Sequence, residues 1–316
     1  MSTDELHHCS ADRSGVTLGR YILRVCAALA VLLGMTASAQ AQYTAVTFYF
    51  VAHQDDWQLF MNNNAYPDMQ NPAVKVVFVY MTAGDAGSGQ SYFLAREEGA
   101  KSAVRFVVDA VLGPDAGASP GSSSWASLNG HGVVRYAYKN TVSYFLRLPD
   151  GNGDGSGFPA TGYVSLQKFW TGQVSYLTAV DGSTSYWGTD DLFWTIYAIA
   201  HNEAAGAQWA WINMPDPIPG YNPNDHSDHY HTGWFVETVA ANLVTCMNVA
   251  YYVDYDIYRR ARNVSDDALL NQAGVFAVTV HGRTEAGHGS TWDPGHKSWL
   301  GRSYYRTRSG YGPPCF

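Results

Sequence analysis

One buried strand that ends at a histidine and two aspartates constrains this chain most. Residues 46–52 (Val-Thr-Phe-Tyr-Phe-Val-Ala) carry no charge and are β-branched, aromatic or small. A continuous apolar run of this kind is typical of a strand buried on both faces of a parallel sheet. The run stops at His53, which is followed by Gln54, Asp55 and Asp56. Because ligands bind beyond the carboxyl ends of parallel strands, the sequence predicts a functional site here.

The rest of the chain alternates between strand and helix patterns. A second apolar strand is expected at residues 74–82, followed by the glycine turn 83–87 and a helix over residues 92–111, whose apolar side chains recur on one face. This order is a βαβ-type unit. Further helices are expected at residues 190–203 (capped by Thr189 or Asp190), 234–247 and 266–280, and further strands at residues 133–138, 141–148, 210–213 and 249–255. The predicted fold is a single α/β domain with a Rossmann-like, mainly parallel sheet flanked by helices.

Residues 113–131, which are rich in Gly, Ser and Pro, are expected to form a loop. No element is predicted for residues 58–73, which are mostly polar, or for the aromatic and glycine-rich tail 282–316, which shows no clear period.

Residues 1–41 are expected to be a signal peptide. Two arginines precede a short apolar run at residues 25–33, and small residues follow at 37–41 with Ala-x-Ala spacing. The apolar run is too short to span a bilayer. We therefore expect residues 42–316 to form a secreted or periplasmic domain with no stable membrane anchor after cleavage.

The charge and the cysteines limit the partners and the compartment. The net charge is −8 and no basic block occurs, which argues against binding to nucleic acid or to an anionic membrane. Cys9 and Cys26 lie in the leader, so Cys246 and Cys315 remain in the domain. An oxidising compartment would let these two pair. The sequence leaves open whether they do.

A second cluster, His226-Ser227-Asp228-His229, lies in the proline-rich loop after residues 210–213. A lone histidine or aspartate at a strand end is most often structural, for example as a helix cap. Two such clusters can instead supply two imidazoles and a carboxylate to one metal, with a position left for water. Three side chains would make this set, His53, Asp56 and His229. The set suits zinc and also Fe²⁺.

The clusters and the glycine turn together resemble the LmbE-like, or PIG-L, family of zinc-dependent N-acetylglucosaminyl deacetylases. The family's Ala-His-Pro-Asp-Asp-Glu stands as residues 52–57 (Ala-His-Gln-Asp-Asp-Trp), its Thr-x-Gly-x-x-Gly as residues 82–87, and its His-Pro-Asp-His-x-x-x-Gly as residues 226–233. Arg96 matches an arginine that opens a helix between the second and third motifs. The resemblance covers the chain from about residue 46 to about residue 281 and implies deacetylation of an N-acetylglucosamine-type sugar or glycoconjugate.

The resemblance also implies a role for each matched residue. Zinc would be held by His53, Asp56 and His229. Asp55 would be the general base toward the attacking water. His226 would stabilise the oxyanion or protonate the leaving amine, oriented by Asp228. Arg96 and Asp150 would bind the substrate.

This chain departs from the family pattern at four positions, Gln54, Trp57, Gly99 and Ser227. Gln54 and Ser227 stand where the family has proline, and Trp57 and Gly99 stand where it has glutamate. None of these changes removes a ligand or the base, so they put the substrate in question and not the reaction. Trp57 and the insert at residues 113–160 are the features expected to reshape the pocket.

Several alternatives stay open. In one, the substrate carries a different N-acyl group; in another, the protein binds carbohydrate without catalysis, although the intact Asp55 argues against a silent site. The loop at residues 150–155 starts like a calcium loop, but Thr161 occupies the place of the required glutamate, so a solvated loop is expected.

Four aromatic residues of the tail would form a sugar-binding rim or pack the tail onto the domain: Trp292, Trp299, Tyr304 and Tyr305. Three histidines are expected on the surface, His201, His288 and His296.

Overall fold

The computed structural model describes residues 43–113, 121–243 and 246–311. The chain divides into two units, Met1–Gln42 and Tyr43–Phe316, and the described residues all belong to the second. The predicted signal peptide at residues 1–41 and the possible disulfide partner Cys315 lie outside the described residues. No helix in the described ranges is long and apolar enough to cross a membrane.

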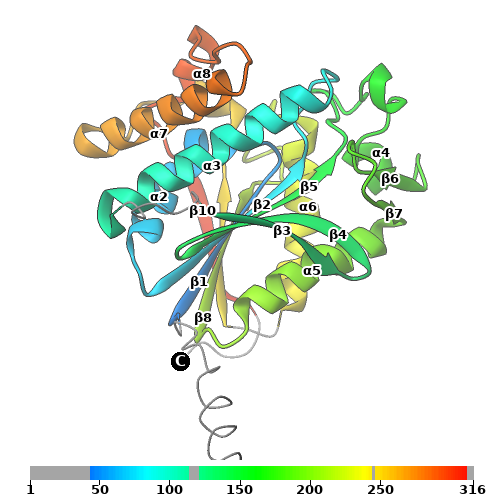
Figure 1. The fold of residues 1–316 in the computed structure, drawn as a ribbon, viewed down its shortest axis with the longest axis horizontal. Coiled ribbons are helices and arrows are strands. Elements are labelled where there is room, and N and C mark those ends of the chain that lie inside the picture. Colours follow the sequence, from blue (N-terminus) through cyan, green and yellow to red (C-terminus); the bar gives the residue numbers. More distant parts are fainter. Residues whose placement is uncertain (1–42, 114–120, 244–245, 312–316) are drawn as a thin grey trace, which may run out of the picture. The chain divides into compact units, whose positions relative to one another are not determined.

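An eight-stranded sheet forms the centre of the second unit, in the order β10-β9-β8-β1-β2-β5-β4-β3 (Figure 1). The five middle strands are parallel: β9 (Met247–Tyr252), β8 (Trp209–Pro215), β1 (Ala45–Val51), β2 (Val74–Thr82) and β5 (Thr141–Leu148). The outer strands pair antiparallel: β10 (Tyr305–Tyr311), β4 (His131–Tyr138) and β3 (Ser122–Leu128). All residues of β1 are buried, as the apolar run predicts.

Helices cover both faces of this sheet (Figure 1). One face is covered by α2 (Asn62–Gln70), α3 (Gln90–Leu112) and α7 (Asp266–Glu285), which share an apolar core with side chains of the sheet. The other face is covered by α5 (Thr189–Ala204) and α6 (Ser227–Asn242), which share a second apolar core. The predicted α/β, Rossmann-like, mainly parallel architecture is confirmed.

The remaining elements are short. They are η1 (Trp57–Met61, a π-helical turn), η2 (Pro159–Thr161), α4 (Leu166–Trp170), the hairpin of β6 (Tyr176–Thr178) and β7 (Ser185–Trp187), η3 (Tyr255–Arg259) and α8 (Pro294–Trp299). The predicted cap of the helix expected at 190–203, by Thr189 or Asp190, is wrong, because both residues lie inside the helix. The helix follows Gly188 and has no side-chain cap.

The carboxyl ends of the five parallel strands meet at one edge of the sheet. Strand β1 has β2 on one side and β8 on the other, so the direction of winding reverses at β1. A crevice forms at such a reversal, beyond the carboxyl ends of the strands. The segments that enter this region follow β1 at residue 52, β2 at residue 83, β5 at residue 149, β8 at residue 216 and β9 at residue 253.

The loop expected at residues 113–131 is wrong in part, because it contains β3, and the two segments without a predicted element also contain helices or strands. Residues 58–73 hold most of η1 and all of α2, which contains Pro67 and three consecutive asparagines. This helix is fixed by contacts from outside it, because Ala65 and Met69 are buried and Asn64 hydrogen-bonds to Tyr252. Strand β3 is an exposed edge strand, and the tail contains α8 and β10.

Two of the residues that depart from the family pattern, Gly99 and Trp57, contribute to the packing of the domain. Helices α3 and α7 approach so closely that a Cβ added at Gly99 would lie 2.5 Å from the backbone oxygen of Thr279. A glutamate at this place would therefore force the two helices apart. Trp57 is fully buried, and its Nε1 donates a hydrogen bond to Tyr80 Oη at 2.9 Å. The expectation that Trp57 reshapes the pocket is therefore wrong, because its side chain belongs to the core.

Candidate active site

The three predicted metal ligands converge beyond β1 and β8. His53 Nδ1 lies 3.5 Å from Asp56 Oδ1, and His229 Nε2 lies 3.3 Å from both Asp56 Oδ2 and His53 Nδ1. All three residues are buried. A tetrahedral zinc with bonds of about 2.0–2.2 Å places its donors roughly 3.3–3.6 Å apart. The spacings of the two ring nitrogens from each other and from the Asp56 carboxylate therefore suit a tetrahedral metal such as zinc.

Local structure holds each of these ligands. The Asp56 carboxylate accepts a hydrogen bond from the backbone N–H of His53 at 2.7 Å, which closes the turn after β1. Helix α6 begins at Ser227, with His226 as its N-cap, and not at residue 234 as predicted. The predicted start is wrong because residues 227–233 are mainly polar and show no apolar face, although the carboxylate of Asp228 suits the first turn of a helix. His229 is thus carried by a helix and not by a loop.

Carboxylates stand behind both histidines. His229 Nδ1 lies 2.8 Å from Asp225 Oδ1 and 3.5 Å from Asp254 Oδ2. His53 Nε2 lies 3.5 Å from Asp228 Oδ2. Metal-binding histidines usually turn their second ring nitrogen to such an oxygen, which orients the ring. Asp225 and Asp254 were not predicted, and the only signal for them was their place after β8 and β9.

The same carboxylates favour protonation of the two histidines. Burial lowers the pKa of His53, but the charge of Asp56 and the contact with Asp228 outweigh it and raise this pKa to about 10. Burial also opposes protonation of His229, yet Asp225, Asp56 and Asp254 raise its pKa well above the usual value. Because a protonated imidazole cannot bind a metal, a metal entering this site has to displace these protons.

Arg96 contacts the predicted general base directly. Its guanidinium forms an ion pair with Oδ1 of Asp55. Its Nε donates a hydrogen bond to Gln54 Oε1 at 3.1 Å, and Gln54 Nε2 donates to the backbone oxygen of Thr82 at 2.9 Å. Gln54, which stands where the family has proline, therefore connects the end of β2 to Arg96.

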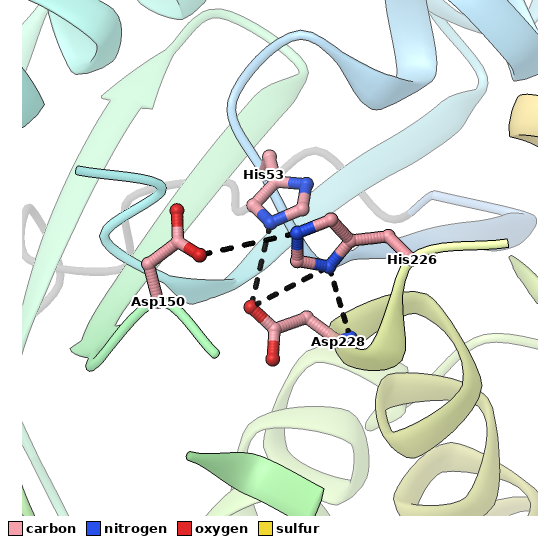
Figure 2. A group of neighbouring side chains, drawn as sticks. All are labelled: His53, Asp150, His226 and Asp228. Atoms are coloured by element: carbon pink, nitrogen blue, oxygen red, sulfur yellow. Dashed lines mark hydrogen bonds and ion pairs between the residues drawn. The ribbon is translucent and has the colours of Figure 1, made fainter. Parts of the chain in front are cut away.

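Figure 2 shows His226 between Asp150 and Asp228, with His53 also directed at the Asp228 carboxylate. Asp228 Oδ2 lies 3.8 Å from His226 Nδ1, but the hydrogen bond to that nitrogen comes from the backbone N–H of Asp228 at 3.1 Å. The hydrogen bond between Asp228 and His226 is thus made by the main chain of Asp228. The other ring nitrogen, Nε2, lies 4.0 Å from Asp150 Oδ1. Burial and the nearby His53 lower the pKa of His226 to about 4.

The Asp228 carboxylate also requires a glycine at position 151. The backbone N–H of Gly151 donates to Asp228 Oδ2 at 2.9 Å. A Cβ added at Gly151 would lie 2.3 Å from Asp228 Oδ1. This close approach ties the loop after β5 to the first turn of α6.

A cavity of about 290 Å³ opens onto this group. Six residues predicted for the site line it: His53, Asp55, Asp56, Arg96, Asp150 and His226. His229 is fully buried behind them. The insert also contributes Asn152, Gly153 and Phe158 to the lining. The structure thus brings all eight predicted site residues into one region, and the role of each stays a prediction.

Three further aromatic side chains line the cavity, Tyr255, His296 and Trp299. The expectation that His296 lies on the surface is wrong, because its ring is partly buried in the cavity wall. The sequence allows Trp299 either a sugar-binding or a packing role, and in the structure it both lines the cavity and hydrogen-bonds to Tyr255. Its position depends on the path of the tail, for which the sequence shows no period.

No protein-family model matches the chain, and no curated protein matches it either. Among solved structures, N,N'-diacetylchitobiose deacetylase from Pyrococcus horikoshii, complexed with its inhibitor MPG in an acetate-containing condition, is similar with a TM-score of 0.45 and 13% sequence identity over 95% of each chain. A likeness of this degree carries no argument about activity, so the function has to be argued from the residues.

Proposed function

We propose that residues 42–316 form a metal-dependent amide hydrolase that removes the N-acetyl group of an N-acetylglucosamine-type sugar or glycoconjugate. One observation carries the proposal. The facing ring nitrogens of His53 and His229 lie 3.3 Å apart, each within 3.5 Å of an oxygen of Asp56, and Asp55 and His226 line the adjoining cavity. The match of residues 52–57, 82–87 and 226–233 to the LmbE-like pattern supports an amino sugar as substrate.

Three side chains would hold the metal, His53, Asp56 and His229. Zinc suits their spacing, and two imidazoles with one carboxylate also suit Fe²⁺. When bound, such an ion lowers the pKa of water to about 7 and polarises a carbonyl group.

Asp55 is placed to take a proton from the attacking water. Its Oδ1 is paired with Arg96, which fixes the side chain and leaves the second oxygen as the acceptor. Asp55 lines the cavity, so that oxygen can reach a ligand there. The proton that Asp55 takes up is then available for the leaving amine nitrogen.

His226 is placed to donate a hydrogen bond to the oxygen of the amide. Its Nδ1 accepts the backbone N–H of Asp228, so the proton of the neutral ring is on Nε2. A donor aimed at the oxygen that becomes negative lowers the barrier to acyl transfer. Of the two roles implied for His226, this geometry supports oxyanion stabilisation.

The test combines metal content with acetate release from N-acetylglucosamine, its disaccharide and short chitooligosaccharides. We expect about one metal per chain and acetate release that a chelator abolishes and zinc restores. Asp55→Asn should keep the metal and lose activity by about 10²- to 10⁴-fold. His229→Ala should lose the metal.

The matched control is Asp267→Asn, at an exposed position in the first turn of α7. It should behave like the wild-type protein. A wild-type protein that takes up no metal, or an Asp55→Asn variant as active as the wild type, would overturn the proposal.

We also propose that the chain is exported and that residues 1–39 or 1–41 are removed. Cys246 is disulfide-bonded, and disulfides persist in oxidising compartments. N-terminal sequencing of the protein from the periplasm or the medium should begin at Gln40 or Gln42. Recovery of the intact leader from the cytoplasm would contradict this proposal.

A further inference from the structure

The C-terminal part of the domain forms a wall of the cavity that the matched motifs do not explain. Trp299 at the end of α8 and Tyr255 at the start of η3 stack with ring centroids 4.8 Å apart and an interplanar angle of 16°. The indole Nε1 donates a hydrogen bond to the backbone oxygen of Tyr255 at 3.1 Å. Tyr255 meets the ring of His229 edge-on at 4.9 Å. The two stacked rings are therefore fixed beside the candidate metal ligands.

His296 is held in the same wall. Its Nδ1 lies 2.8 Å from Asp293 Oδ2, and its backbone N–H donates to Asp293 Oδ1 at 3.0 Å. Its ring stacks on Phe276 and meets Trp299 edge-on. Within the described parts of the chain, no hydrogen-bond partner is seen for its Nε2. Because the side chain lines the cavity, this nitrogen is available to a ligand.

We propose that Tyr255, Trp299 and His296, called here the aromatic wall, bind the sugar ring of the substrate and set the specificity for it. This inference rests on the proposed function. The flat rings offer an apolar surface to the C–H face of a pyranose. The imidazole adds one hydrogen bond to a hydroxyl group. A cavity of about 290 Å³ is at the small end of ligand sites, so one hydroxylated ring with its acyl group would contact the wall directly.

The hydrogen bond from His296 is tested with the metal-loaded full chain. His296→Ala should raise KM for N-acetylglucosamine about 3- to 10-fold, the usual range for one lost hydrogen bond, and leave kcat within about twofold. His296→Gln should recover most of the loss, because its amide can reach the same hydroxyl. The wild-type protein should bind the deoxy sugar that lacks this hydroxyl more weakly than the full sugar, by a similar factor. The His296→Ala variant should bind the two sugars equally well.

The stacking surface is tested by replacing Trp299 with apolar side chains that keep or lose a flat ring. Trp299→Leu should raise KM more than Trp299→Phe does, because phenylalanine keeps a flat ring. Trp194→Leu is the matched control, since Trp194 is an exposed tryptophan of α5 that does not line the cavity. Melting temperature and metal content should accompany each variant. A lower melting temperature with unchanged KM in both His296→Ala and Trp299→Leu would mean that the wall only packs the tail, and it would overturn the proposal.

Binding of glucosamine and N-acetylglucosamine, measured by calorimetry, separates this proposal from the proposed function. If the wild-type protein binds the sugars, the wall variants bind them more weakly and no acetate is released, the proposal for the aromatic wall is supported and the deacetylase proposal fails. If the wild-type protein releases acetate and the wall variants have the wild-type KM, the deacetylase proposal is supported and the proposal for the aromatic wall fails.

Discussion

Asp225 is expected to control how tightly the candidate site holds a metal. Its Oδ1 lies 2.8 Å from His229 Nδ1, with both side chains fully buried, and the same oxygen accepts the backbone N–H of Tyr255 at 3.1 Å. Loss of a carboxylate behind a metal-binding histidine weakens metal affinity about 10- to 100-fold, or by about 1.4–2.7 kcal/mol. Asp254, at 3.5 Å from the same nitrogen, remains as a second acceptor. We therefore expect about tenfold weaker zinc binding for Asp225→Ala and about 100-fold for the double variant with Asp254→Ala.

Zinc affinity would be measured by competition with a chelator of known affinity at one fixed pH. Unfolding of the chelator-treated variants would check that they still fold. Asp267→Ala, at an exposed position, is the control and should bind zinc like the wild type. The reasoning is refuted if Asp225→Ala binds zinc within about twofold of the wild type while the fold is intact.

Arg147 Nε and Nη2 donate to the two carboxylate oxygens of the fully buried Glu97 at 2.6 and 2.8 Å. Replacing Arg147 with methionine would leave this carboxylate without the guanidinium. Urea unfolding should show a loss of about 3–5 kcal/mol, which the double variant with Glu97→Gln should partly restore; a loss under about 1 kcal/mol would count against the burial argument. For chelator-treated protein, the pKa of His53 is about 10 in the fold against the ordinary 6.5, so its protonated form stabilises the fold fully below pH 6.5 and this stabilisation disappears as the pH rises toward 10. The melting temperature should fall over that range and fall less in His53→Gln, whereas equal slopes would be the contrary result. Gln54→Leu removes the acceptor for Arg96 Nε and should lower kcat/KM about 3- to 10-fold at unchanged metal content; wild-type kinetics would show that Arg96 needs no such support.

The sequence predicts the middle of this fold well because those elements carry their signal locally. Strand β2 has the predicted bounds, and β1 differs by one residue at each end. A buried parallel strand needs a continuous apolar run, and such a run is visible without knowledge of its neighbours. Helix α2 and strand β3 were missed because contacts with the rest of the domain, and not their own apolar pattern, hold them in place.

The candidate site divides in the same way. The parallel-strand rule and the motif resemblance identified His53, Asp56 and His229, whose donor atoms converge. Asp225 and Asp254, the carboxylates behind His229, were not predicted, because the sequence around an aspartate near a strand end does not show which side chain it will contact. The aromatic wall was not assigned to the site for a related reason. Trp299 and His296 come from a short helix whose place against the cavity follows from the path of the tail between α7 and β10.

The pairing of β1 with β8 has a consequence for folding. The two strands lie side by side, with Ala45 opposite Trp209 and Tyr49 opposite Asn213, yet the histidines that follow them are 176 residues apart in the chain. A slip of one residue would move one strand by about 3.3 Å along the other, which is as large as the spacing of the donor atoms. A misregistered sheet therefore cannot assemble the three ligands, and metal capture has to wait until this long-range contact has closed. The absorption of a bound cobalt ion during refolding would then time the moment at which the two halves of the sheet join in their native register.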